Sequence, residues 1–156
     1  MTHGAERGYD LVIPVTVLPN VVSQIEEVGK RWSLSWIGVE AQDMLRIEAG
    51  VPIYGVDITE ENSLLETGQD RWVNFERQFA GFLLQTKQTI RRGAKIYDGE
   101  REVGTVTSCR FSPHTNSAVA LGYVQRNLIP RACVTIRDGE QSFVATVSFL
   151  PFREQA

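Results

Sequence analysis

Long apolar segments and cysteine are both scarce in this chain of 156 residues, and each scarcity excludes a class of protein. The apolar runs are only a few residues long, far below the roughly 20 residues of a membrane-spanning helix. The two cysteines, Cys109 and Cys133, have no second cysteine or histidine at the spacing of a zinc or redox motif. We therefore expect a globular protein with no membrane segment, no metal site and two buried free thiols.

A concentrated positive charge is lacking as well. The chain has 16 basic and 19 acidic residues and a net charge of −3, whereas nucleic-acid-binding domains normally carry a strong positive field. We therefore expect no nucleic-acid partner. The beginning of the sequence also has neither a basic stretch followed by an apolar core nor an arginine- and serine-rich leader, which favours a cytoplasmic location.

The first half of the chain is predicted to be mainly helical. Pro19 opens a helix at its first turn, and apolar residues spaced three and four apart follow until Gly29 ends it. A second helix has a core face around Leu45, so Arg46 is expected off that face. The predicted elements are a strand at Tyr9–Val15 and helices at Pro19–Gly29, Glu40–Ala49 and Phe79–Lys87.

From Thr89 onward the sequence changes to short β-rich runs. Asp98-Gly99 and Asp138-Gly139 lie between alternating apolar residues, which is a strong hairpin signal. Five or six such strands predict a compact antiparallel barrel. We place the domain boundary near Lys87, giving domains 1–87 and 88–156. The predicted strands are Ile90–Tyr97, Val103–Val106, Val119–Val124, Cys133–Ile136 and Phe143–Phe149.

Four blocks of sequence resemble one known family, in the same order along the chain. The longest is Asp43-Met-Leu-Arg-Ile-Glu-Ala-Gly-Val-Pro-Ile-Tyr-Gly55, which looks like a hallmark helix and turn. Two further blocks, Gly4-Ala-Glu-Arg-Gly-Tyr-Asp-Leu11 and Arg77-Gln-Phe-Ala-Gly81, are similar to Thr-Gly-Glu-Asp-Gly-Phe-Glu-Ile and Lys-Asp-Phe-Ile-Gly. The last is Gly104-Thr-Val-Thr-Ser-Cys-Arg-Phe-Ser-Pro113 with Ala118-Val-Ala-Leu-Gly-Tyr-Val124, against Gly-x-Val-Thr-Ser-Gly-x-Phe-Ser-Pro and Ile-Ala-Leu-Ala-x-Val. These patterns are typical of the glycine-cleavage T-protein family of folate-binding aminomethyltransferases.

The resemblance implies an α+β fold, in which part of the folate-binding domain (1–87) is followed by the family's C-terminal antiparallel β-barrel (88–156). It implies transfer of a one-carbon unit to tetrahydrofolate as cofactor. The family's catalytic aspartate lies in an N-terminal half that has no counterpart here, so we assign no catalytic residue and expect the chain alone to be inactive. A partner is expected, either the missing N-terminal half or a second copy of the chain. The alternative is a non-enzymatic folate-binding or protein-interaction module.

Three residues are predicted to bind folate from the same resemblance. Glu6 matches the family's pterin-binding glutamate, because a carboxylate can accept the paired N–H groups of a pterin ring; otherwise it is an exposed residue. Arg46 could pair with a folate carboxylate, or form an ordinary ion pair with Asp43. Tyr54 could stack on a ring, or pack in the core.

Other positions that match the family have simpler explanations or depart from its pattern. Helix capping, turns and ion pairs can account for the acids Asp43, Glu48, Asp57 and Glu66. Cys109 replaces a glycine of the family pattern. The segment from Gly81 to Leu84 replaces Gly-Arg-Glu-Ala-Leu and loses two charges, which puts substrate contacts in doubt.

Overall fold

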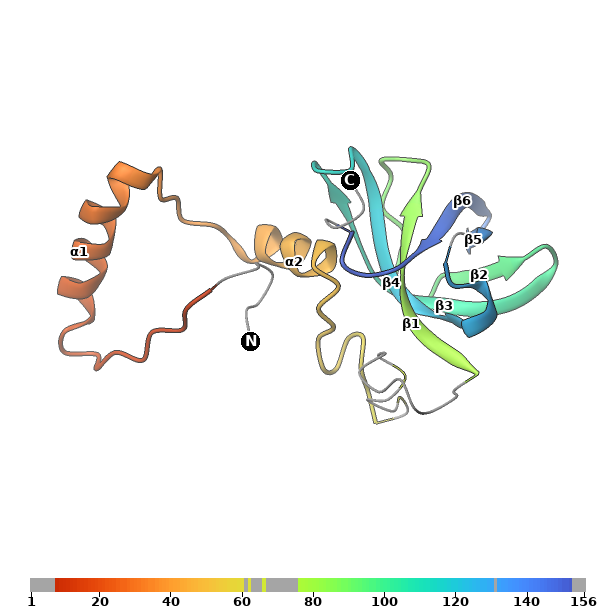
Figure 1. The fold of residues 1–156 in the computed structure, drawn as a ribbon, viewed down its shortest axis with the longest axis horizontal. Helices are drawn as coiled ribbons and strands as arrows, with labels where there is room; N and C mark the ends of the chain where they lie inside the picture. Colours follow the sequence, from red (N-terminus) through yellow and green to blue (C-terminus); the bar gives the residue numbers. More distant parts are fainter. Residues whose placement is uncertain (1–7, 61, 63–65, 67–75, 131, 153–156) are drawn as a thin grey trace.

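The computed structural model describes residues 8–60, 62, 66, 76–130 and 132–152. In these residues a helical N-terminal part precedes a β-barrel, and helix α2 lies against the barrel whereas α1 stands away from it (Figure 1). The helical elements are α1 (Leu18–Gly29), η1 (Lys30–Trp32), α2 (Val39–Glu48) and η3 (Arg126–Leu128). The strands are β1 (Arg77–Leu84), β2 (Lys95–Asp98), β3 (Arg101–Ser112), β4 (Ser117–Gln125), β5 (Cys133–Asp138) and β6 (Gln141–Ser148).

The six strands form one closed antiparallel barrel, with the neighbour order β1-β4-β3-β2-β5-β6. Strand β6 pairs back to β1, with Gly81 opposite Ser148, so no strand in this sheet has a free edge. The barrel interior is filled by small and branched apolar side chains. The antiparallel barrel and the α+β class predicted from the sequence are confirmed. The fully buried members of this core are Phe82, Ile96, Ala118, Ala120, Val124, Ile136, Ala145 and Val147.

Both hairpins predicted from Asp-Gly are confirmed. Strand β2 turns into β3 with Asp98 opposite Arg101, and β5 turns into β6 with Asp138 opposite Gln141. The glycine that follows each aspartate has a positive φ, +60° at Gly99 and +64° at Gly139. A residue with a Cβ rarely adopts that conformation, so the two-residue loops depend on these glycines.

Strand β1 corrects the prediction of a helix at Phe79–Lys87. The chain there is a strand with buried apolar residues on both faces: Phe82 points into the barrel core, and Phe79 packs against Tyr123 on the outside. When a strand carries apolar residues on both faces, their spacing along the sequence can match that of an amphipathic helix. Strand β1 lies before position 87, so the barrel is formed from residues on both sides of that position.

The N-terminal segment corrects a second prediction. Residues 8–14 have no strand pairing, and Val12 is fully exposed, so the predicted strand at Tyr9–Val15 is wrong. The two predicted helices are observed as α1 and α2, each within about one residue of its predicted bounds. In α1 only Gly29 is buried. The apolar stripe that predicted α1 is therefore only partly covered by the described residues, with Val21, Val22 and Ile25 half-buried.

The two cysteines differ in their surroundings. Cys109 is buried in the barrel, and burial raises the pKa of its thiol. Cys133 is exposed, which corrects the expectation that both thiols are buried. Among the described residues, no group of three histidine, cysteine, aspartate or glutamate side chains could hold a metal ion. In the same part of the chain no helix has the length and apolar character needed to cross a membrane.

Candidate functional site

A β-bulge in strand β3 creates the polar contact between the barrel and the preceding segment. Val106 pairs with Gly122 and Ser108 pairs with Leu121, so Thr107 is an extra residue in the strand. Successive side chains of a regular strand point to opposite faces, but a bulge redirects one of them. The hydroxyls of Thr107 and Ser108 therefore both donate to the same oxygen, Oδ1 of Asp57.

Arg46 completes this cluster from helix α2. Its Nη1 lies 2.5 Å from Oδ2 of Asp57, its Nη2 donates to the Ser108 hydroxyl at 2.8 Å, and its Nε lies 2.7 Å from Oδ1 of Asp43. The side chain is only 5% exposed. Burial of a guanidinium is tolerated here because each of its nitrogens has a partner. We call Arg46, Asp57, Thr107 and Ser108 the Asp57 cluster.

The burial of Arg46 corrects the prediction that it lies off the packed face of its helix. Helix α2 places Arg46, Ile47 and Glu48 together in buried positions, with Ile47 in an apolar cluster on the outside of the barrel. The Ser112 hydroxyl donates to Glu48. Two buried polar contacts therefore flank one apolar residue where α2 meets the barrel. The remaining members of that apolar cluster are Phe79, Val119, Leu121, Tyr123 and Phe152.

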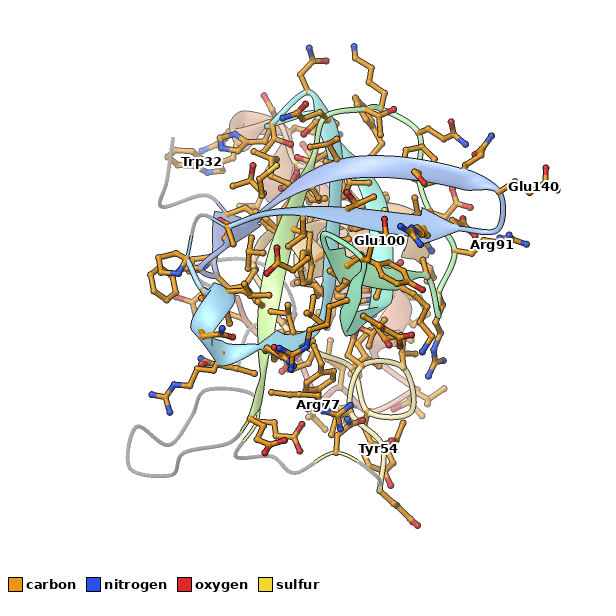
Figure 2. All side chains as sticks on the ribbon, turned by 90° about the vertical axis from the view of Figure 1, so that its right-hand side faces the viewer. Trp32, Tyr54, Arg77, Arg91, Glu100 and Glu140 are labelled. Atoms are coloured by element: carbon orange, nitrogen blue, oxygen red, sulfur yellow. The ribbon has the colours of Figure 1, made fainter. Side chains whose placement is uncertain are left out.

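An open groove of about 500 Å³ lies beside the Asp57 cluster. Its charged lining includes Arg110 of strand β3, whose Nη2 lies 2.8 Å from Oδ2 of Asp43. Tyr54 is 71% exposed and lies at the end of the molecule away from the β5–β6 hairpin (Figure 2). We call this the α2 groove, and its lining residues are Val39, Glu40, Gln42, Asp43, Arg46, Val51, Pro52, Ile53, Tyr54 and Arg110.

The segment that carries Tyr54 is fixed by short-range contacts. The backbone N–H of Ile53 donates to Oδ2 of Asp57 at 3.0 Å, and the N–H of Gly55 donates to the carbonyl of Ile58 at 2.7 Å. Gly55 has φ of +84°, which this turn requires and which glycine adopts readily. Asp57 thus fixes the segment that forms one wall of the groove, and it also makes the contact with strand β3.

The structure describes two of the three residues that the sequence predicts to bind folate. Glu6 lies outside the described residues. Arg46 and Tyr54 both line the α2 groove, so the structure brings these two together, and their role in folate binding stays a prediction. Arg110 was not singled out from the sequence, because a lone arginine on a strand gives no local signal of a groove formed with a distant helix.

Tyr123 lies on the outer face of the barrel with a buried hydroxyl that has no hydrogen-bond partner among the described residues. Burial, together with the nearby carboxylates of Glu66 and Asp57, raises the pKa of Tyr123 to about 12. The protonated phenol is therefore held at this position well above the usual pH of tyrosine ionisation.

Comparison with known protein families gives two matches that meet where β1 begins. The family model described as GCVT N-terminal domain matches residues 1–77. The family model described as Glycine cleavage T-protein C-terminal barrel domain matches residues 77–153.

Relatives and a solved structure agree with these matches. Aminomethyltransferase of Corynebacterium aurimucosum is 29% identical over 171 aligned positions, which cover 96% of this chain and 46% of the relative. The one from Halothermothrix orenii is 29% identical, covering 96% of this chain and 48% of the relative. The crystal structure of glycine cleavage system aminomethyltransferase T from Bartonella henselae gives a TM-score of 0.73 at 27% identity, covering 88% of this chain and 45% of that chain. The chain spans about half the length of the curated relatives it matches.

A closed antiparallel barrel, with helix α2 ion-paired to strand β3 through Asp43 and Arg110, defines an α+β protein of the architecture shared with that crystal structure. Both family models and the relatives point to the same assignment. The chain belongs to the glycine cleavage T-protein family of aminomethyltransferases.

Proposed function

We propose that the chain forms the C-terminal part of a tetrahydrofolate-dependent aminomethyltransferase, which transfers a one-carbon unit to tetrahydrofolate. The family assignment supports this function, since the relatives that cover most of this chain are named Aminomethyltransferase. When bound, tetrahydrofolate would accept the one-carbon unit. The residues of this chain would bind and orient it.

The α2 groove is the observation that carries the proposal, because its lining fits the parts of a folate. Tyr54 offers an exposed aromatic ring beside Pro52 and Ile53, which suits a flat ligand ring. Arg110 offers a guanidinium that suits a carboxylate. Arg46 would act by holding the groove wall through Asp57, since its own nitrogens already have protein partners.

The binding of tetrahydrofolate tests the proposal directly. We expect a calorimetric or fluorescence titration to show binding, and Tyr54→Ala to weaken it about ten-fold because a stacked aromatic ring is lost. Tyr9→Ala is the matched control, since Tyr9 is exposed and lies outside the groove. Undetectable binding, or an equal effect of the two substitutions, would argue against a folate site in the groove.

We also propose a polypeptide partner that corresponds to the N-terminal part of the relatives. The support is a set of exposed aromatic and branched side chains around α1, among them Trp32 at 81%, Trp36 at 72% and Ile37 at 59% exposure. Exposed apolar groups of this density usually mark a contact surface.

Sedimentation velocity tests this partner. The chain is mixed with the N-terminal part of the Corynebacterium aurimucosum relative, and a complex that Trp32→Ser weakens is the expected result. Self-association of the chain alone would favour a second copy instead.

If Glu6 binds the pterin ring, Glu6→Ala should weaken tetrahydrofolate binding to the complex by about 1–3 kcal/mol. Binding without one-carbon turnover in the complex would favour the folate-binding module over the enzyme.

A further inference from the structure

Arg110 stands out in the α2 groove because the family pattern does not specify it. The block Gly-x-Val-Thr-Ser-Gly-x-Phe-Ser-Pro leaves any residue at this position, whereas the hydroxyl residues Thr107 and Ser108 match the pattern. The contacts of Thr107 and Ser108 belong to the Asp57 cluster. Arg110, two residues after Ser108, lines the α2 groove instead.

Two contacts hold the Arg110 guanidinium in place. Nη1 donates to the backbone carbonyl of Cys109 at 3.0 Å, and Nη2 lies 2.8 Å from Oδ2 of Asp43. Asp43 is itself fixed, because its other oxygen accepts from Nε of Arg46 at 2.7 Å. A guanidinium held in this way loses little rotational freedom when it binds a ligand.

The same side chain remains accessible to a ligand. It is 49% exposed, and two of the five N–H donors of a guanidinium account for the contacts with Cys109 and Asp43. The remaining donors are available in the groove. The charges of the groove lining balance, with Arg46 and Arg110 against Glu40 and Asp43. Recognition by Arg110 therefore depends on direct hydrogen bonds with a ligand rather than on a broad positive field.

We propose that Arg110 is a specificity-determining residue that binds the glutamate carboxylates of the ligand, while the aromatic part of the ligand lies against Pro52 and Tyr54. This inference rests on the proposed function, and it names the carboxylate-bearing p-aminobenzoylglutamate portion of tetrahydrofolate as the group that Arg110 recognises. An arginine and a carboxylate form the strong, charge-assisted pair that such selection needs.

A comparison of two ligands tests the role of Arg110. Tetrahydrofolate and its dimethyl ester, in which both glutamate carboxyls are esterified, are titrated against the chain by fluorescence. We expect the wild type to prefer the free acid about ten-fold or more. Arg110→Gln should reduce this preference to near unity and leave the affinity for the ester unchanged. Arg110→Lys should retain part of the preference because it keeps the charge.

Arg101→Gln is the matched control, since Arg101 is an exposed arginine of the same strand at the hairpin end. Thermal unfolding of each variant checks that the loss of the Asp43 contact does not unfold the groove. Equal binding of the two ligands by the wild type, or an unchanged preference in Arg110→Gln, would overturn this inference and leave the proposed function standing. Binding of neither ligand, either to the chain alone or to its complex with the N-terminal partner, would overturn the proposed function, and the role of Arg110 with it.

Discussion

At the scale of single residues, the buried carboxylate of Asp57 has partners from three parts of the chain. It pairs with Arg46 of helix α2, accepts from the hydroxyls of Thr107 and Ser108 on β3, and accepts from the backbone N–H of Ile53. A buried ion pair adds little net stability when it is intact, because desolvation offsets the attraction. Its loss is costly, because the remaining charge stays buried without a partner.

Asp57→Ala should therefore lower the free energy of unfolding by about 3–5 kcal/mol, since Arg46 loses its most buried partner. Urea denaturation followed by circular dichroism measures the change. Asp10→Ala is the control, because Asp10 is exposed and should change stability by less than about 0.5 kcal/mol. A cost below about 1 kcal/mol for Asp57→Ala would show that the Asp57 cluster does not hold the two parts together.

Tyr123 gives a pH-dependent prediction. Its pKa is raised to about 12, mainly by burial, so the folded protein keeps the phenol proton at a pH where the unfolded chain loses it. The protonated phenol therefore contributes fully to the free energy of unfolding at a pH below its usual pKa of about 10. This contribution is lost as the pH rises from there to about 12. Tyr123→Phe should leave stability at pH 7 unchanged or slightly increased, because the hydroxyl it removes has no partner among the described residues.

The measurement for Tyr123→Phe is the difference in unfolding free energy between pH 7 and pH 11. The wild type should lose more stability than the variant over this interval. Tyr9→Phe serves as the control, because Tyr9 is exposed. A marked destabilisation by Tyr123→Phe at pH 7 would contradict the prediction, because it would show that the hydroxyl makes a stabilising contact.

At the scale of the elements, strands β3 and β4 approach each other closely at two glycines. A Cβ on Gly104 would lie 2.1 Å from the backbone oxygen of Tyr123, and a Cβ on Gly122 would lie 2.4 Å from that of Thr105. Neither glycine has a positive φ, so the requirement is for space rather than for backbone conformation. The absence of a side chain at these points allows β3 and β4 to approach each other this closely.

Gly104→Ala should lower the unfolding free energy by about 1–3 kcal/mol, the usual cost of overpacking, because backbone atoms cannot move away from the new methyl group. Thermal unfolding measures the loss. Gly38→Ala is a suitable control, since a Cβ there meets no atom within 4 Å. If the two variants are equally stable, the contact between β3 and β4 is looser than the structure indicates.

Elements defined by local signals could be predicted from the sequence, and those defined by distant partners could not. The Asp-Gly hairpins and both helices carry their signals within a few residues. Strand β1 depends on pairing with β4 and β6, so its sequence alone looked helical. The same limit applies to the site. Tyr54 and Arg46 were found through a contiguous block, whereas Ser108 lies 62 residues from Arg46 and no local pattern joins them.

At the scale of the whole molecule, the described residues divide into a barrel with a closed core and a helical part, in which α2 and the segment with Asp57 contact the barrel whereas α1 stands away from it (Figure 1). The barrel core includes residues of β1 together with residues of the five later strands. The sequence predicts a barrel that begins after Thr89. The structure corrects this expectation, because β1 closes the sheet between β4 and β6.

A fragment that starts at Glu76 should therefore fold as a barrel, whereas one that starts at Gln88 should not. The shorter fragment lacks β1 and leaves β4 and β6 with unpaired edges. Amide hydrogen exchange of both fragments, each ending at Ala156, measures the difference. Slowly exchanging amides in the fragment from Gln88 would contradict the need for β1, and their absence from the longer fragment would contradict an independently stable barrel.

The bulge at Thr107 means that strand β3 is one residue longer than its own sheet requires. Without Thr107, Val106 and Ser108 would be adjacent opposite Gly122 and Leu121, and the inward positions of Val106 and Cys109 would be preserved. The length of this strand is thus set by the neighbouring segment that carries Asp57. In related barrels, the gain or loss of a single residue at this point should accompany the gain or loss of an acidic group in the facing loop.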